Sequence, residues 1–317
     1  MALGEFELIR RFFEQPAKRA LLGIGDDCAL LAAPARHAAL AVTTDMLVCD
    51  RHFLADAPPA SIGHKALAVN LSDLAAMGAA PVGFTLALAL PQVDEAWLAE
   101  FSAGLLALAS ATGCELLGGD TTRGPLTISI TAIGEVPPGA ALRRDAAQAG
   151  DDVWVSGSLG AAALAVREAL AGRPLPEAHP ARCRMERPQA RLSLGLALRS
   201  LAHAAIDVSD GLISDLGHVC DRSRLGAHID WNAVPVDASL AALSEDERKT
   251  LALSGGDDYE LLFTAKPSRR DAIQALQDRL GLAVTRIGQM SEQPGIRITG
   301  ADARAVVLER GGFDHFA

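Results

Sequence analysis

Strand patterns and helix patterns follow one another along the whole chain of 317 residues. Residues 126–136 begin with a regular alternation of apolar side chains with threonine or serine, which predicts a half-buried strand. Residues 94–111 have the composition of a helix, with Asp94 as its N-cap and Gly113 as its stop. Because such segments are mixed throughout, the sequence predicts an α/β or α+β fold.

The other expected elements support two domains, since a chain of this length holds about two domains of roughly 150 residues each. We expect helices over 5–13, 58–77, 159–171, 189–200, 211–223 and 268–280, and strands over 38–42, 84–90, 152–157, 204–208, 226–231 and 259–265. The Pro- and Arg-rich stretch 171–188 is expected to be a surface connection. The turn-rich stretch 137–150 predicts the boundary, with domains at 1–140 and 150–317.

Charge and cysteine content limit the class of protein. The chain has 29 basic and 39 acidic residues, a formal charge of −10, whereas nucleic-acid binding needs clustered lysine and arginine. It has no apolar run of about 18 residues and no signal-peptide pattern, so we expect neither a membrane span nor export. Five cysteines without a C-x-x-C pair suggest free thiols in a reducing compartment, and a cytoplasmic protein.

Six short segments share one design, a turn of small residues that presents an aspartate. They are GIGDD (23–27), TTD (43–45), NLSD (70–73), GGDTTRG (118–124), DVSDG (207–211) and SGGDD (254–258). Each one alone is explained by turn formation, because aspartate and glycine favour turns. Three of them, TTD, GGD and DVSD, are expected to follow the ends of predicted strands, where binding sites collect in α/β folds.

Carboxylates that converge at one place repel each other, by about 4 kcal/mol at about 4 Å for an effective dielectric near 20. A cation must offset this repulsion, or some of the acids must take up protons. Oxygen ligands without cysteine or histidine favour Mg²⁺, with Ca²⁺ or Mn²⁺ as alternatives. If the turns converge, the sequence predicts a site for several magnesium ions, and such sites usually accompany phosphates.

The sequence contains no G-x-x-x-x-G-K-[ST] phosphate loop and no protein-kinase glycine loop. It has only four lysines, and none of them follows a glycine-rich loop. If ATP binds, metal ions rather than a lysine must therefore neutralise most of the phosphate charge.

Together these segments resemble the thiamine-monophosphate kinases. The resemblance rests on GEFELIRRFF, GIGDDCALL, TTDMLV, KALAVNLSDLAAMGA, LLGGDTTRGPL, IDVSDGLISDLGH, LSGGDDYELLF and GFDHFA, which occur in family order and cover nearly the whole chain. It implies the transfer of a phosphoryl group from ATP to thiamine monophosphate, giving thiamine diphosphate and ADP. It also implies a homodimer in which the N-terminal sheets pair into a barrel, and a C-terminal α/β domain that covers the nucleotide.

The resemblance also implies roles for individual residues. The residues that resemble magnesium ligands are Asp27, Thr43, Thr44, Asp45, Asp73, Asp120, Asp207 and Asp210. Those that resemble ATP contacts are Gly119, Asp120, Arg144 and Ser209, and those that resemble substrate contacts are His52, Asp257 and Phe313. Asp257 stands where the family pattern often has glutamate, and Phe313 where tyrosine or tryptophan also occurs.

Ordinary structural roles are open for several of these residues. Without the resemblance, Arg144 would be read as a solvated connector residue and His52 as a surface histidine. Ser209 would be read as a helix cap, and Phe313 as a packed tail residue. Two other functions also stay open: another ATP-dependent member of the superfamily, such as a selenophosphate synthetase, and a metal-binding protein without catalysis. The first expects a reactive cysteine in an N-terminal glycine-rich segment, whereas the first cysteine here is Cys28.

Overall fold

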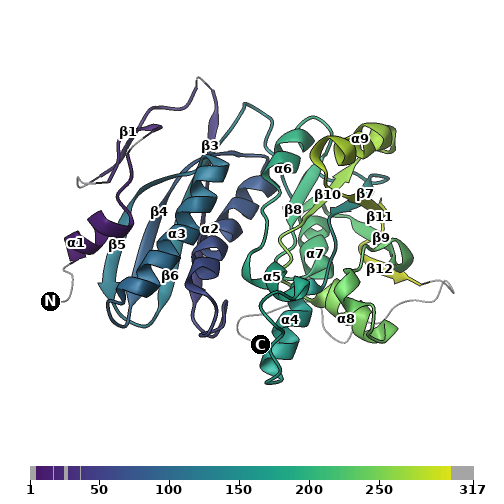
Figure 1. Cartoon of the computed structure of the whole chain (residues 1–317). Helices are drawn as coiled ribbons and strands as arrows, with labels where there is room; N and C mark the ends of the chain where they lie inside the picture. Colours follow the sequence, from purple (N-terminus) through teal and green to yellow (C-terminus); the bar gives the residue numbers. More distant parts are fainter. Residues whose placement is uncertain (1–4, 17, 25–27, 36, 301–317) are drawn as a thin grey trace. The chain divides into compact units, whose positions relative to one another are not determined.

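The chain folds into two compact units (Figure 1), and the computed structural model describes residues 5–16, 18–24, 28–35 and 37–300. Unit 1 ends at Gly139 and unit 2 begins with Ala140, except that the short segment Ala75–Gly78 belongs to unit 2. The division falls within the turn-rich stretch 137–150. None of the described helices is both long and apolar enough to cross a membrane.

Unit 1 is built on a four-stranded sheet with the strand order β3-β6-β4-β5. Strand β6 is antiparallel to both of its neighbours, whereas β4 and β5 are parallel. The elements up to β6 are α1 (Glu5–Phe12), β1 (Ala20–Leu22), β2 (Leu30–Leu31), β3 (Ala39–Val48), α2 (Pro59–Ala76), β4 (Ala80–Leu90), α3 (Glu95–Thr112), β5 (Glu115–Arg123) and β6 (Thr127–Val136). Strands β1 and β2 form a separate antiparallel pair.

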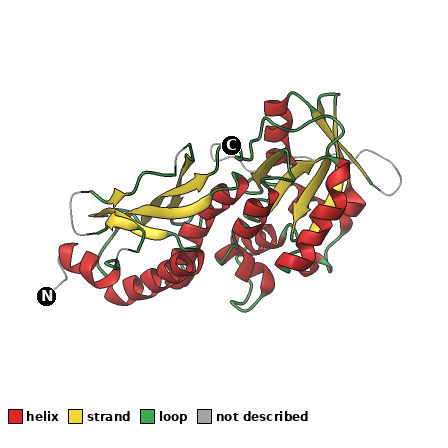
Figure 2. Cartoon of the chain, turned by 90° about the horizontal axis from the view of Figure 1, so that it is seen from above, coloured by secondary structure: helices red, strands yellow, loops and turns green. Residues whose placement is uncertain are grey.

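The helices of unit 1 lie on one side of its sheet, as Figure 2 shows. The alternation in β6 follows from this arrangement: Ile128 and Ile130 are buried, whereas their neighbours Thr127, Ser129 and Thr131 are only partly covered. The predicted caps of α3 are confirmed, since Asp94 accepts hydrogen bonds from the N–H groups of Ala96 and Trp97, and Gly113 is left-handed. The two-layer architecture leaves the other face of the sheet open.

Two strands of unit 1 run further than predicted, so the expectation that TTD and GGD follow strand ends is wrong. Every residue of β3 pairs with one of β6, including Thr43–Asp45, because the ladder continues and threonine is well suited to a strand. The segment 118–120 likewise lies within β5 and pairs with β4. Only the third expectation is confirmed, since β8 ends at Asp207.

Unit 2 is built on a six-stranded mixed sheet with the order β12-β9-β11-β7-β10-β8. Its elements are β7 (Asp152–Ser156), α4 (Ala161–Leu170), α5 (Pro180–Glu186), α6 (Leu192–Leu198), β8 (Ala204–Asp207), α7 (Leu212–Ser223), β9 (Gly226–Asp230), η1 (Trp231–Ala233), η2 (Ala238–Leu240), α8 (Glu245–Ser254), β10 (Leu261–Ala265), η3 (Pro267–Arg269), α9 (Arg270–Leu280), β11 (Val284–Ser291) and β12 (Gly295–Thr299). The predicted α/β class is therefore confirmed for both units.

Two separate cores cover the two faces of this sheet. Successive residues of β7 show the division: Val153 and Val155 pack in the core that includes residues of α7 and α8, whereas Trp154 packs in the core of α6 and α9. Strands β7 and β10 are buried along their whole length for this reason. Unit 2 thus has three layers, with helices on both faces of the sheet. Strand β8 is connected to the start of α7 by a short turn.

The stretch 171–188 is not only a connection, because it contains α5. His179 caps this helix, Pro180 occupies its first turn, and Arg182 forms a buried ion pair with Glu186 at 2.6 Å. Proline at a first helical position is compatible with a helix, so the proline content that suggested a surface connection did not reveal this partly buried helix within it.

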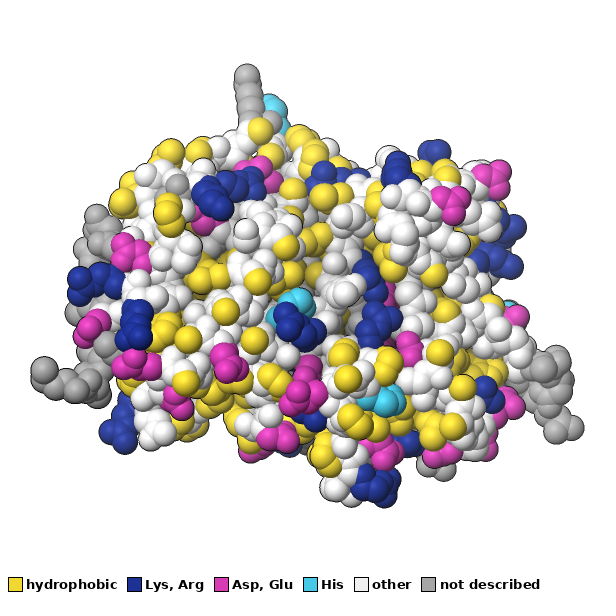
Figure 3. Space-filling view, in the orientation of Figure 1, with side chains coloured by type: hydrophobic (Ala, Val, Ile, Leu, Met, Phe, Trp, Pro, Cys, Tyr) yellow, Lys and Arg dark blue, Asp and Glu magenta, His cyan; other side chains and the backbone are white. Residues whose placement is uncertain are grey.

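On the face that Figure 3 shows, acidic and basic side chains are interspersed with apolar ones. Such mixing of charges is typical of a solvated surface.

Helices α2 and α3 pack closely where each has a glycine. A Cβ atom added at Gly104 would lie 1.9 Å from the carbonyl oxygen of Ala60, and one at Gly63 would lie 2.1 Å from that of Phe101. Both obstructing atoms belong to the backbone and cannot rotate away. The close approach of the two helices therefore depends on the missing side chains.

We predict that Gly104→Ala destabilises the protein by about 1–3 kcal/mol, the usual cost of overpacking. The matched control is Gly217→Ala in α7, where the added Cβ meets no atom within 4 Å. That change should leave stability unchanged or raise it by about 0.5–1 kcal/mol. Chemical denaturation of both variants tests the packing, and a Gly104→Ala protein as stable as the wild type would contradict it.

Candidate functional site

In unit 1, strand β3 and helix α2 bring three of the predicted magnesium ligands together. Thr43 and Asp45 point to the same side of β3, because side chains two positions apart share a face of a strand. The Thr43 hydroxyl donates a short hydrogen bond to Oδ2 of Asp73, which lies on α2. Burial and the neighbouring Asp73 carboxylate raise the pKa of Asp45 to about 6. This group of Thr43, Asp45 and Asp73 is called the β3–α2 cluster below.

A buried asparagine supports the β3–α2 cluster. Oδ1 of Asn70 accepts a hydrogen bond from the main-chain N–H of Asp45 at 3.1 Å, and its Nδ2 donates to the carbonyl of Ala66 at 3.1 Å. Asn70 is fully buried and therefore fixes the distance between α2 and β3 at this point. The NLSD segment contains it, although only Asp73 was predicted to have a role.

Two other predicted ligands lie on the opposite face of the same sheet. The hydroxyl of Thr44 lies 2.8 Å from that of Thr131 on β6. Asp120 pairs with Ala87, Ala87 with Ser129, and Ser129 with Met46, which places Asp120 on the face of Met46 rather than that of Asp45. The fold of unit 1 therefore does not bring Thr44 and Asp120 to the β3–α2 cluster. Gly119 is adjacent to Asp120 within β5.

His52 lies in the turn that follows β3. Its Nδ1 accepts a hydrogen bond from the main-chain N–H of Val48 at 3.0 Å. In the neutral ring the proton therefore resides on Nε2, which makes that atom a hydrogen-bond donor.

In unit 2, strand β8 and helix α7 are joined by a turn, residues 208–211, that carries Ser209 and Asp210. Asp207 is the last residue of β8 and is 3% exposed. Oδ2 of Asp215, within the first turns of α7, accepts hydrogen bonds from the main-chain N–H groups of Ser209 at 3.0 Å and Asp210 at 3.1 Å. Three residues of the predicted site thus lie within one β–turn–α connection.

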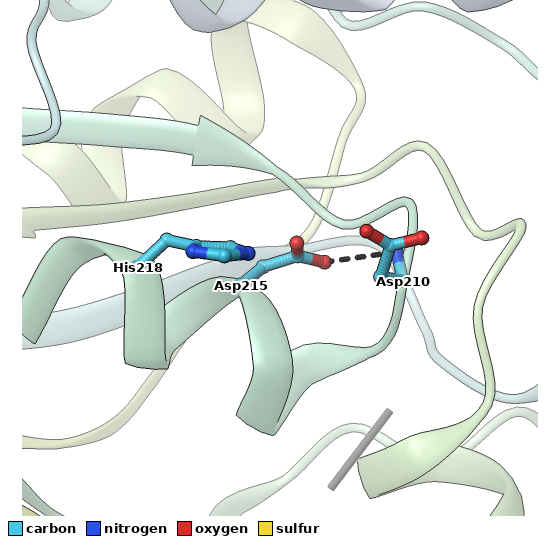
Figure 4. Close-up of side chains that lie close together, drawn as sticks. All are labelled: Asp210, Asp215 and His218. Atoms are coloured by element: carbon cyan, nitrogen blue, oxygen red, sulfur yellow. Dashed lines mark hydrogen bonds between the residues drawn. The ribbon is translucent and has the colours of Figure 1, made fainter. Parts of the chain in front are cut away.

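Asp215 and His218 join Asp210 in a group of three potential ligands, which Figure 4 shows. One donor atom from each side chain lies within 4.8 Å of the other two. Burial and the Asp210 carboxylate raise the pKa of Asp215 to about 7, while the hydrogen bonds from the N–H groups of Asp210 and Ser209, and to a smaller extent the charge of Arg144, partly offset this rise. Arg144 therefore acts on the same acidic group. Asp215 and His218 were not predicted, although their spacing of three residues on a helix places them on one face.

A second segment, residues 254–260, lies against this turn. The main-chain N–H of Asp257 donates to the carbonyl of Ser209 at 2.8 Å, and that of Tyr259 donates to the carbonyl of Val208 at 2.8 Å. A Cβ atom at Gly256 would lie 2.2 Å from the carbonyl oxygen of Ser209, so only glycine permits this approach. The predicted substrate residue Asp257 is thereby held beside the predicted ATP residue Ser209.

Two acids that follow Asp257 in the chain, the buried Glu260 and the partly buried Asp258, support this segment. Glu260 is fully buried, accepts a hydrogen bond from the Ser156 hydroxyl at 2.5 Å and pairs with Arg191. Asp258 accepts from the main-chain N–H of Gly160 at the start of α4. Burial raises the pKa of Asp258 well above its ordinary value. These contacts anchor both sides of the segment to the sheet and to α4.

The remaining predicted residues, Asp27 and Phe313, lie outside the described residues. Among the described ones, two groups of oxygen-bearing side chains stand out, the β3–α2 cluster in unit 1 and Asp207 with Asp210 in unit 2, whereas Thr44 and Asp120 lie on the other face of the unit 1 sheet. Carboxylate and hydroxyl oxygens of this kind suit a hard divalent cation.

Comparisons with known proteins agree with this organisation. Residues 25–136 match the N-terminal domain of AIR synthase related proteins, and residues 148–301 match the C-terminal domain. The chain is 47% identical over 325 residues to the thiamine-monophosphate kinase of Salmonella typhimurium, covering 100% of this chain and 99% of that protein.

Solved structures show the same similarity. The thiamine-monophosphate kinase of Stenotrophomonas maltophilia is 48% identical with a TM-score of 0.87, covering 96% of this chain and 99% of that one. A structure of AaThiL complexed with AMPPCP and TMP is 28% identical with a TM-score of 0.76, covering 90% of each chain. On this full-length similarity, the chain belongs to the thiamine-monophosphate kinase family of enzymes.

Proposed function

We propose that the protein transfers the γ-phosphoryl group of ATP to thiamine monophosphate, forming thiamine diphosphate and ADP. The observation that carries this proposal is the full-length identity of 47% to a thiamine-monophosphate kinase. The AaThiL complex supports the choice of both substrates, because AMPPCP is an ATP analogue and TMP is the proposed acceptor.

The chemistry needs no strong general base. The acceptor is a phosphate whose oxygen is already anionic near neutral pH, so no proton must be removed before it attacks. In the proposed direct in-line transfer, this oxygen bonds to the γ-phosphorus while the bond to the bridging oxygen of ADP breaks. Positioning and electrostatic stabilisation then supply the catalysis, as is usual for phosphoryl transfer.

We assign magnesium binding to two sets of oxygen ligands, Thr43, Asp45 and Asp73 in unit 1 and Asp207 and Asp210 in unit 2. The raised pKa of Asp45 beside Asp73 supports a cation there, because a bound divalent ion would favour both ionised carboxylates. When bound, such ions neutralise phosphate charge. The resemblance adds Asp27, Thr44 and Asp120, of which Thr44 and Asp120 lie on the other face of the unit 1 sheet.

Nucleotide and substrate contacts follow the same assignment. Gly119, Asp120, Arg144 and Ser209 contact ATP, while His52, Asp257 and Phe313 contact thiamine monophosphate. The Nδ1 atom of His52 accepts a hydrogen bond from the main-chain N–H of Val48, so the neutral ring has its proton on Nε2. This N–H group can donate a hydrogen bond to a phosphate oxygen of thiamine monophosphate. Phe313 provides a ring that stabilises the cationic thiazolium by about 0.5–2 kcal/mol.

We also propose that a second copy of the chain covers the open face of the unit 1 sheet. On β3 this face presents three exposed apolar side chains, Leu40, Val42 and Met46, which alternate along the strand. These side chains share one face of the strand, with Thr44 between Val42 and Met46, and exposed apolar patches mark interaction sites when they are large. Pairing of two such sheets would give the dimeric barrel expected for this family.

Incubation of the protein with Mg-ATP and thiamine monophosphate should yield thiamine diphosphate and ADP by mass analysis, whereas free thiamine should not be converted. If no thiamine diphosphate forms, the proposed function is wrong. Nucleotide binding without any product would instead favour a metal- and nucleotide-binding protein.

A chiral, isotopically labelled γ-phosphate tests the mechanism in the same reaction. One direct displacement predicts inversion at phosphorus, and retention would require an intermediate on the enzyme.

We predict that Asp45→Asn raises the melting temperature of the metal-free protein by about 2–4 °C, the effect of about 1 kcal/mol in a domain of roughly 150–250 residues. The substitution removes a partly buried charge that faces the carboxylate of Asp73. The same variant should lose more than about tenfold in activity and should lose part of the stabilisation that Mg²⁺ gives the wild type. Asp56→Asn, at an exposed position outside the cluster, is the control. A metal-free Asp45→Asn protein that is less stable than the wild type would contradict the repulsion.

For the dimer, light scattering should give twice the 33.0 kDa mass of one chain. Val42→Lys should shift the protein towards the monomer, because the lysine places a charge on the apolar face of β3. Leu170→Lys, at an exposed apolar position of α4, should leave the mass unchanged. A wild-type monomer, or a Val42→Lys protein that stays dimeric, would rule out this interface.

A further inference from the structure

The turn of residues 208–211 carries Ser209 and Asp210, and one side chain holds it from the side of α7. Asp215 is 2% exposed, and its Oδ2 atom accepts hydrogen bonds from two successive main-chain N–H groups, those of Ser209 and Asp210. Figure 4 shows Asp215 between Asp210 and His218, with the bond to Asp210 drawn as a dashed line. Asp215 therefore contacts the backbone of both functional residues.

From the other side, backbone groups of residues 254–260 hold the turn. The N–H groups of Asp257 and Tyr259 donate to the carbonyls of Ser209 and Val208. The N–H group of Val208 in turn donates to the carbonyl of Glu260 at 2.8 Å. Residues 254–260 therefore hold Val208 and the carbonyl of Ser209, whereas the carboxylate of Asp215 holds the N–H groups of Ser209 and Asp210. Among the described residues, no other side chain accepts a hydrogen bond from the N–H groups of Ser209 and Asp210.

Loss of the Asp215 acceptor would leave both N–H groups without this partner. Hydrogen bonds to a charged acceptor are stronger than neutral ones, and a buried donor that loses its partner costs more than an average hydrogen bond contributes. The turn could then relax away from the conformation in which Ser209 and Asp210 are held. A binding site gains affinity when its residues are already held in the bound geometry.

We propose that Asp215 is a positioning residue for the turn of residues 208–211. It acts by accepting hydrogen bonds from the N–H groups of Ser209 and Asp210 rather than by contacting a ligand. This inference rests on the proposed roles of Ser209 in ATP binding and Asp210 in metal binding. It gives a function to Asp215, the aspartate of the D-x-x-H sequence in α7, which was not among the site residues inferred from the sequence.

The test compares Asp215→Asn with Asp215→Leu. Asparagine retains one acceptor oxygen of similar placement, whereas leucine has a similar volume and no acceptor. We expect Asp215→Leu to raise KM for Mg-ATP by about tenfold or more, and Asp215→Asn to stay within about threefold of the wild type. Asp221→Asn, the same chemical change at an exposed position of α7, should behave as the wild type.

Hydrogen exchange of the backbone provides a second measurement that does not depend on activity. Peptides spanning residues 206–211 should exchange faster in Asp215→Leu than in the wild type, while peptides from β10 should keep their protection. This pattern separates a local loosening of the turn from a general loss of structure. Protection lost equally in β10 would contradict a local role.

Two kinetic outcomes would overturn the inference. If Asp215→Asn is impaired as strongly as Asp215→Leu, the charge itself is needed, as for a direct metal ligand. If Asp215→Leu retains the wild-type KM, the two hydrogen bonds do not position the turn. Should the wild type lack kinase activity, the proposed function fails, and the exchange experiment alone decides whether Asp215 holds the turn.

Discussion

Repulsion between gathered carboxylates is the constraint on which both candidate ligand sets depend. The pKa of Asp45 is raised to about 6 beside Asp73, and that of Asp215 to about 7 beside Asp210, with burial as the larger cause in each case. A fold keeps such groups together only if other contacts hold the elements that carry them. In unit 1 these contacts are the ten-residue ladder of β3 with β6 and the buried amide of Asn70. A divalent cation would turn the repulsion into attraction.

In unit 2, backbone hydrogen bonds hold the segments that carry the acidic residues. Asp257 and Tyr259 have positive φ angles of 72° and 51°, a conformation that costs of order 1–3 kcal/mol for a residue other than glycine. The contacts of both N–H groups with the 208–211 turn offset this cost, as do those of Glu260 with Ser156 and Arg191. The 208–211 turn and the 254–260 segment thereby stabilise each other's conformation. The positions of Ser209, Asp210 and Asp257 are therefore fixed by the fold itself.

The sequence predicted the elements well where the local signals were strong, as with the caps of α3 and the alternation of β6. It failed where partners far along the chain decide the outcome. TTD was expected to follow a strand, but pairing with β6 extends β3 through it, and the resulting alternation separates Thr44 from Thr43 and Asp45. That Asp120 shares the face of Thr44 follows only from the strand pairing, in which Asp120 of β5 pairs with Ala87 of β4 and Ala87 with Ser129 of β6. Asp215 was missed because an acid within a helix is usually solvated, and its burial follows from packing.

The central claim is that these carboxylates hold divalent cations for phosphoryl transfer. Anomalous diffraction from crystals grown with Mn²⁺, AMPPCP and thiamine monophosphate tests it most directly, because manganese takes the same oxygen ligands as magnesium and can be located independently. We expect manganese peaks bound by Asp45 and Asp73 and by Asp207 or Asp210. Nucleotide bound without manganese at any of these carboxylates would contradict it.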